Sequence, residues 1–253
     1  LEPFGLENES RYQPMKRRIS SLALGFYGFN NMVGMDYLGA GIFGSGENEI
    51  FSWALDLYIG QSRIPTSRYF DADYDNSSEY YRLRNGPLAG GGRLLLEMPG
   101  ADLSMAVSGK FARRSGERAL NDYAASLSLM YQAQFLEVVV EGLYGKSLDQ
   151  FMDFYLQLAY ELVNDLSFVA RFDWLDTFPR SREGRHLRHH QEVMAALAYQ
   201  FTENWRTELT YHLVTGNRFA RPSGYEGVSL FRSRTNDWAL HTQAVMFGLV
   251  VSL

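Results

Sequence analysis

The feature that most constrains this chain is a period-two alternation of apolar and polar side chains, which recurs in segments of about ten residues. Between Phe51 and Ile59 every second residue is large and apolar, and Ser52, Ala54 and Asp56 lie between them. Successive side chains of a strand point to opposite faces, so this order places all the large apolar residues on one face. A helix, with its period of 3.6, would mix the two sets. The pattern therefore predicts β-strands.

The alternation predicts about twelve strands, each long enough to cross a bilayer when tilted. Besides 51–59, it is clear at 103–112, 123–131, 136–144, 152–162, 166–174, 193–201 and 205–213. It is weaker at 18–29, 31–43, 87–99 and 237–253. Segment 152–162 resembles an amphipathic helix most, but its apolar residues fit alternation better. The sequence predicts an all-β protein of about twelve strands, within a range of about 10 to 14.

The connections between these segments alternate between short and long from the third predicted strand onward. The short ones lie at 99–102, 132–134, 163–165 and 202–204, and the long ones at about 60–87, 113–120, 145–150, 176–190 and 215–236. This order is typical of antiparallel up-and-down barrels that have short turns on the periplasmic side and long loops outside the cell. The connection near Asn30 and Asn31 departs from it, because it is too short for an exterior loop.

Alternation alone does not say whether the apolar face points inward, as in a soluble barrel or sandwich, or outward into lipid. A helical membrane protein is excluded, because no apolar run approaches the length of a membrane helix. The polar phase holds Ser, Ala and Gly beside its charges, unlike a uniformly charged soluble surface. Aromatic residues next to the short turns would form a girdle at the lipid interface; they are Tyr131, Phe135, Tyr160, Phe168, Phe201 and Trp205. Both features favour an apolar face toward lipid.

The last segment carries a family resemblance, because Val245, Phe247, Leu249, Val251 and Leu253 alternate up to the final residue. This resembles the C-terminal insertion signal of bacterial outer-membrane β-barrel proteins, although that signal usually ends in Phe. The resemblance implies an outer-membrane location and contact with outer-membrane lipid and lipopolysaccharide. It assigns a role to no individual residue. On this interpretation residues 18–253 form a transmembrane barrel in which the first strand pairs with the twelfth. Residues 1–17 form a periplasmic segment or a plug.

The polar phase of the strands would then line the lumen, and its charged members are the candidate functional residues. They are Asp56, Arg93, Glu97, Lys110, Glu137, Glu141, Asp153, Glu161, Arg171, Asp173, Glu192, Arg206, Glu208 and His212, with nine acids against four Arg and Lys. A wet lumen of this kind predicts a mildly cation-preferring channel for small solutes or an extended polymer. The alternative is a filled barrel, in which Arg93, Arg171 and Arg206 bridge carboxylates on neighbouring strands.

Other parts of the chain suggest partners or exclude classes of function. A basic loop with Arg180, Arg182, Arg185 and Arg188 could bind lipopolysaccharide phosphates or guide an anionic ligand, or be a solvated loop. The net charge of −5 gives no basic field for nucleic acid. No cysteine is present, and no cofactor motif or metal site is expected. The glycine run 89–92 is expected to serve a bend or close strand packing.

Two further classes of function remain open at the sequence level. A non-conducting barrel could anchor a secretion or polysaccharide-export complex and bind a periplasmic partner. A lipid-modifying outer-membrane enzyme needs a Ser or a His with a carboxylate near the outer rim. His241 has no assignable partner of this kind, so no catalytic residue is predicted and the chain is not expected to be an enzyme.

Overall fold

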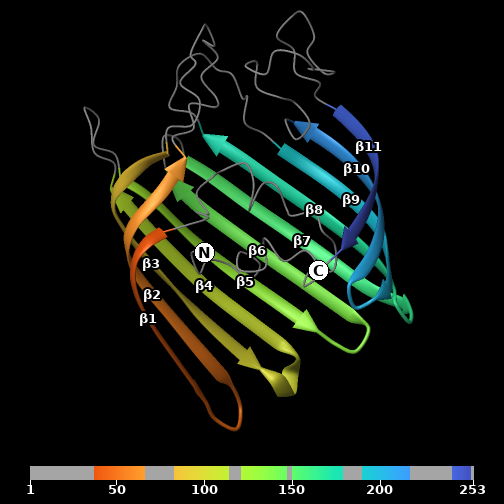
Figure 1. The fold of residues 1–253 in the computed structure, drawn as a ribbon, viewed down its shortest axis with the longest axis horizontal. Coiled ribbons are helices and arrows are strands. Elements are labelled where there is room, and N and C mark those ends of the chain that lie inside the picture. Colours follow the sequence, from red (N-terminus) through yellow and green to blue (C-terminus); the bar gives the residue numbers. More distant parts are fainter. Residues whose placement is uncertain are drawn as a thin grey trace, which may run out of the picture.

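The described part of the molecule is one antiparallel sheet of eleven strands (Figure 1). The computed structural model describes residues 37–65, 83–113, 121–146, 150–178, 190–216 and 241–251. In chain order the strands are β1 (Tyr37–Glu47), β2 (Ser52–Pro65), β3 (Leu83–Met98), β4 (Leu103–Arg113), β5 (Asn121–Gln132), β6 (Leu136–Lys146), β7 (Gln150–Val163), β8 (Leu166–Phe178), β9 (His190–Thr202), β10 (Trp205–Gly216) and β11 (His241–Val251). The 3-10 turn η4 (Pro99–Ala101) is the one helical element in these ranges.

Each strand pairs with its neighbours in sequence, in the order β1 to β11, which confirms the predicted all-β, up-and-down architecture. Eleven of the twelve predicted segments overlap a strand, and the segment 18–29 lies outside the described residues. The segment predicted at 31–43 overlaps β1, and its predicted end was wrong, because β1 continues to Glu47. Its four glycines, at positions 39, 41, 44 and 46, interrupt the apolar alternation on which the prediction depended.

The sheet curves into a trough with β1 and β11 along its two rims (Figure 1). Closure between the first and last strands was also predicted. In the described ranges the sheet ends at β1 and β11, which do not pair with each other, so it is not a closed barrel. The segment 18–29, which was predicted as the first strand and the partner of the last, lies outside the described residues.

Short turns join the strands at one end of the sheet, at the four places where they were predicted and also between β1 and β2. In this first turn the Asn48 side-chain Oδ1 accepts hydrogen bonds from the backbone N–H groups of Ile50 and Phe51, at 2.8 and 2.9 Å. Asp165 lies in the tight turn between β7 and β8 with a φ of 68°. Asn and Asp tolerate these conformations better than most residues, because their side chains bond nearby backbone.

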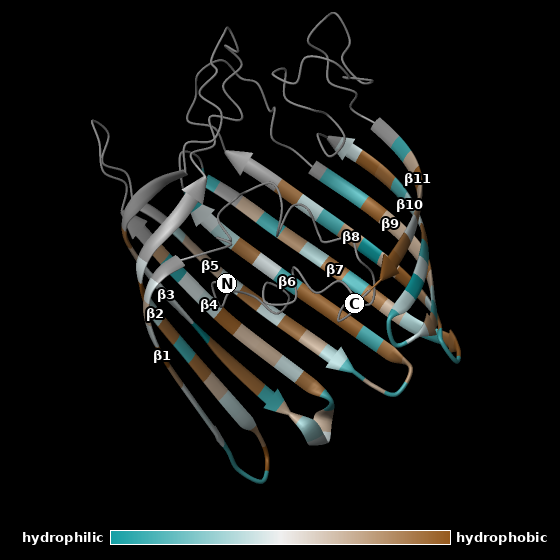
Figure 2. Cartoon of the chain, viewed as in Figure 1, coloured by the Kyte–Doolittle hydropathy of each residue, from teal (hydrophilic) through white to brown (hydrophobic). Residues whose placement is uncertain are grey.

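The two faces of the sheet differ in the way that the alternation predicted. In β5, Ala124, Ser126 and Ser128 are buried, whereas Leu127 and Leu129 between and after them are 50% and 38% exposed. Figure 2 shows the corresponding alternation of hydrophobic and hydrophilic residues along the strands. The large apolar phase is thus the outward, exposed phase, and the small and charged phase is buried on the inner face. A soluble sandwich has the opposite arrangement.

Candidate functional site

The predicted lumen-lining residues all belong to the inner phase of their strands, but their burial differs. Six of the fourteen are half-buried or exposed: Asp56, Arg93, Glu97, Lys110, Glu137 and Glu161. The other eight are buried at 4% exposure or less: Glu141, Asp153, Arg171, Asp173, Glu192, Arg206, Glu208 and His212. The buried group comes from β6 to β10 only. The structure therefore concentrates the candidate site on one side of the trough.

A row of five cross-strand neighbours forms the centre of this site. Ser128, Glu141, Tyr155, Asp173 and Glu192 lie directly opposite one another on β5, β6, β7, β8 and β9. Each is at most 1% exposed. We call these five residues the carboxylate row. The Tyr155 hydroxyl donates a hydrogen bond to the Glu141 carboxylate, so one of its three acids is held by a neutral donor.

Asp153 lies one inward position from the carboxylate row, on β7 toward the long connections. It is 3% exposed. The like charges of Asp173 and Glu141 act on its carboxylate. Neither carboxylate oxygen has a side-chain hydrogen-bond partner among the described residues, and the buried hydroxyls of Ser126 and Ser128 also have none. Buried polar atoms are normally satisfied, so the side chains of Asp153, Ser126 and Ser128 are unusual on this part of the inner face.

His212 connects the carboxylate row to Thr210 on the same strand. Its Nδ1 lies 2.5 Å from Glu192 Oε1, and its Nε2 lies 2.9 Å from Thr210 Oγ1. Hydroxyl, imidazole and carboxylate occur in this order in hydrolases, where an oxyanion hole completes the site. Here Thr210 pairs with Ala196 on one side and Met246 on the other, so the backbone donors around it belong to the sheet. The geometry orients His212 and provides no oxyanion hole.

Two arginines form ion pairs on the inner face. Arg93 Nη2 lies 2.8 Å from Asp56 Oδ2 on the neighbouring strand, and Arg93 Nε donates to the same oxygen at 3.0 Å. This confirms the predicted bridge between strands at Arg93. Arg206 Nη2 lies 2.7 Å from Glu208 Oε1, two residues along its own strand, and the expected bridge from Arg206 to a neighbouring strand stays a prediction. The inward side chains of positions i and i+2 are adjacent on one face.

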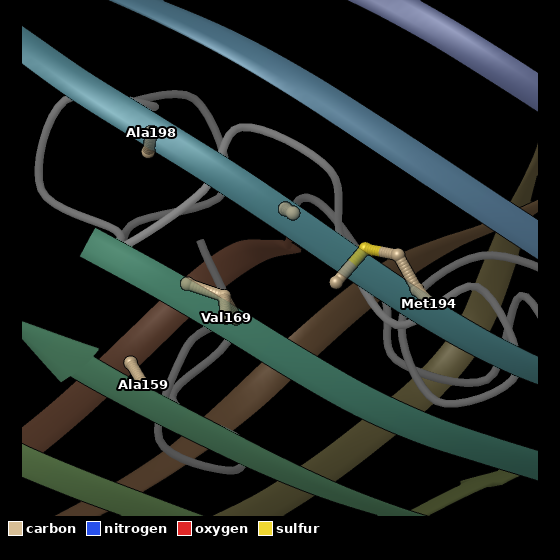
Figure 3. Close-up of a cluster of buried hydrophobic side chains, with 5 residues drawn as sticks. Ala159, Val169, Met194 and Ala198 are labelled. Atoms are coloured by element: carbon tan, nitrogen blue, oxygen red, sulfur yellow. The ribbon is translucent and has the colours of Figure 1, made fainter. Parts of the chain in front are cut away.

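Small apolar residues occupy the inner face between the carboxylate row and the short turns. Figure 3 shows Ala159, Val169, Met194 and Ala198 on three neighbouring strands, β7, β8 and β9. Each is buried at 3% exposure or less. The acids of the carboxylate row thus lie above this apolar region, whereas the buried Arg206 and Glu208 lie beside it, nearer the short turns.

The predicted set omitted six buried neutral polar residues that share the inner phase: Ser108, Ser126, Ser128, Tyr155, Gln157 and Thr210. All six are buried at 5% exposure or less. The alternation had already placed them on the same face as the charges, so phase alone could have identified them. The selection by charge left them out.

The glycine run confirms the prediction of close strand packing. A Cβ on Gly91 would lie 2.5 Å from the Tyr58 hydroxyl oxygen and 2.6 Å from the Gly109 carbonyl oxygen. The inward Tyr58 ring, 6% exposed, thus lies against a position that only glycine fits. The prediction for the basic loop with Arg180, Arg182, Arg185 and Arg188 lies outside the described residues, as does the side chain of His241.

The outward face of the sheet forms a second candidate surface, for lipid. From β2 to β11 the outward positions carry no Asp, Glu, Lys, Arg or His within 51–59, 88–98, 103–111, 123–131, 136–144, 152–162, 166–174, 191–201, 205–213 and 243–251. The predicted girdle residues are exposed on this face near the short turns: Tyr131 41%, Phe135 50%, Tyr160 48%, Phe168 39%, Phe201 58% and Trp205 49%. A second set, Phe111, Tyr123 and Tyr144, lies toward the other end.

Comparison with known proteins adds no family to this description, because no protein-family model and no curated protein matches the chain. In the described ranges, no helix is both long and apolar enough to span a membrane.

Proposed function

We propose that the chain is a bacterial outer-membrane β-barrel of about twelve strands that passes small solutes and prefers cations. The observation that carries this proposal is the contrast between the two faces of the sheet. The outward face is apolar and uncharged over ten strands, and the inner face holds the acids and bases. The basic loop at 180–188 would face lipopolysaccharide on the cell exterior.

The outward face is too extensive and too uniform for contact with water. Val107, Leu127 and Phe247, on β4, β5 and β11, are 48%, 50% and 73% exposed, so the apolar surface is continuous across the strands. Soluble monomers rarely expose apolar patches larger than a few hundred Å². Lipid is the solvent in which such a face, with polar groups turned inward, is stable.

The spacing of the outward aromatic residues agrees with a bilayer. Tyr123 and Tyr131 are both outward on β5, and eight residues of strand span roughly 27 Å. With a strand tilt of about 40°, the two rings are separated by roughly 21 Å along the membrane normal, close to the height of the apolar band in such barrels. The two aromatic sets would lie at the two interfaces.

A sheet in lipid needs closed edges, because the backbone groups of β1 and β11 could not be hydrated there. We propose that the segment 18–29 supplies the twelfth strand and closes the barrel between these rims. An even strand count then brings the chain's two ends to the periplasmic side.

The charges on the inner face support a preference for cations. Nine acids face four Arg and Lys among the candidate residues, and Arg93 and Arg206 already bind Asp56 and Glu208. In a wet lumen, this excess of acidic over basic side chains attracts cations.

A second candidate function is a filled, non-conducting barrel that anchors a secretion or polysaccharide-export complex. The observation that favours it is burial: Glu141, Tyr155 and Asp173 are 0% exposed, whereas residues that line a wide aqueous pore contact water. Stable co-purification of a periplasmic partner would support this candidate.

The test is single-channel recording of the refolded chain in a planar bilayer with a tenfold KCl gradient. Steady openings support the proposal if their reversal potential has the sign expected for cation selectivity. Its magnitude should stay below about 59 mV, the limit for an ideally selective pore. Asp173→Asn should reduce this potential, whereas Glu203→Gln, an exposed turn residue, should not. Anionic reversal contradicts the cation preference. No current from a folded chain favours the filled barrel.

A further inference from the structure

Phe43 on β1 is an exception to the separation of apolar and polar residues between the two faces of the sheet. It lies directly opposite Asp56, so its side chain belongs to the inner phase. Phe43 is 86% exposed, whereas Tyr58 and Tyr155, the other inner-face aromatic residues whose side chains the structure describes, are 6% and 0% exposed. At this exposure the ring packs against little else in the protein. It therefore presents a flat apolar surface to the lumen.

The Phe43 ring would stay accessible from the lumen in a closed barrel, although β1 lies along one rim of the trough (Figure 1). A strand that joins this rim pairs with backbone groups in the plane of the sheet, while side chains project to either side of that plane. On β1 itself the neighbouring inward positions are Gly41 and Ser45, and both are exposed. Because these two residues are small, a flat ligand has room to lie against the ring.

Beside the ring, the Asp56 carboxylate is held in a fixed orientation and still has one oxygen to offer. Arg93 Nε and Nη2 both donate to Asp56 Oδ2, at 3.0 and 2.8 Å. The other oxygen, Oδ1, accepts no hydrogen bond from the described residues, and the Asp56 side chain is 25% exposed. The inner face of β1 and β2 thus places an exposed ring directly opposite an oriented hydrogen-bond acceptor.

This combination suits a neutral ligand that has both an apolar face and hydroxyl groups. The face of an aromatic ring carries partial negative charge and attracts C–H groups. A carboxylate accepts strong hydrogen bonds from hydroxyl groups. Organic cations also bind to aromatic rings, but here the charge of Asp56 is already matched by Arg93. A pyranose sugar ring has C–H groups on its faces and hydroxyl groups at its edge, and it is uncharged.

We infer that Phe43 and Asp56 bind one ring of a neutral saccharide on the inner wall of the trough, with Arg93 holding the carboxylate in position. The sugar ring packs on Phe43 and donates a hydroxyl hydrogen bond to Asp56 Oδ1. This inference rests on the proposed function, because the saccharide must enter the lumen, and it names a class of solute that the channel passes. The buried acids of β6 to β10 take no part in the contact, so saccharide binding and cation preference involve different strands.

The test is equilibrium dialysis of the refolded full-length chain in detergent against radiolabelled maltohexaose, a neutral chain of glucose rings. We expect saturable binding. Phe43→Ala should weaken it about tenfold because the aromatic face is lost, whereas Phe43→Trp, which keeps such a face, should preserve it. Phe111→Ala is the matched control, because it removes a ring from the outward face, and it should change binding less than about twofold.

Asp56→Asn tests the acceptor, because the amide keeps the shape of the side chain and loses its charge. We expect it to weaken maltohexaose binding several-fold, whereas Glu47→Gln, at an exposed inward position of β1, should have little effect. Circular dichroism verifies that each variant is folded.

Absence of saturable maltohexaose binding in the unmodified chain overturns the inference, and so does an equal effect of Phe43→Ala and Phe111→Ala. Choline that displaces maltohexaose and depends on Phe43 would identify a site for organic cations and would also overturn it. Planar-bilayer current without maltohexaose binding removes the saccharide site and keeps the channel. Binding that depends on Phe43, in a chain that carries no current, keeps the site and contradicts the channel.

Discussion

Leu127→Arg places a charge at the middle of the outward face and tests its contact with lipid. Leu127 lies four residues from both Tyr123 and Tyr131, and its cross-strand neighbours are Val107 and Gly142. An arginine on the lipid face of such a barrel costs about 2–4 kcal/mol at the bilayer midplane and about 0–1 kcal/mol near the interfaces. A substitution on an ordinary hydrated surface changes stability by only about ±0.5 kcal/mol.

Our account therefore predicts that Leu127→Arg lowers the free energy of unfolding by about 3 kcal/mol, more than a hundredfold in the equilibrium constant. Tyr131→Arg, on the same face and strand but in the girdle, serves as the control and should cost about 1 kcal/mol or less. The assay is reversible urea unfolding in phosphatidylcholine vesicles, followed by tryptophan fluorescence. Equal effects at the two depths would refute the assignment of this face to lipid.

Two further outcomes follow from the inner face and the strand packing. Gly91→Ala should destabilise the folded protein by about 1–3 kcal/mol because its Cβ meets Tyr58, while Gly142→Ala, where a Cβ meets nothing within 4 Å, should change stability by less than about 0.5 kcal/mol; urea unfolding measures both. Tyr155→Phe should cost about 1–3 kcal/mol by removing the donor to buried Glu141, and Tyr160→Phe on the outward face should be near neutral in the same assay.

The outward face was the most predictable part of the fold because the physics of alternation is local. Phe51 to Ile59 identify β2 and its apolar face without any knowledge of its neighbours. The same reasoning ended β1 too early, at 43 instead of Glu47, because glycines at positions 39, 41, 44 and 46 carry no side chain to mark the phase. The turns were predictable for a similar reason, since Asn164 and Asp165 are turn residues between two alternating segments.

The site itself was only partly predictable, because it depends on register. Alternation placed Glu141 and Tyr155 on the inner face, but only the pairing of β6 with β7 makes them direct neighbours. The hydrogen bond of His212 with Glu192 likewise depends on how β9 pairs with β10. Selection by charge identified the acids of the inner face. It omitted Ser126 and Ser128, which are buried on the same face. Register across strands is a non-local property that one sequence does not encode in any single segment.

The central claim is that the outward phase of the sheet contacts lipid and the inward phase does not. Ser128 and Leu129 are adjacent on β5 and lie on opposite faces, at 0% and 38% exposure. The chain contains no cysteine, so Ser128→Cys and Leu129→Cys each introduce one unique site for a fluorescent label. With nitroxide-labelled lipids in reconstituted vesicles, our account predicts strong quenching of the label at 129 and weak quenching at 128. Equal quenching at the two positions, or the reverse order, would contradict it.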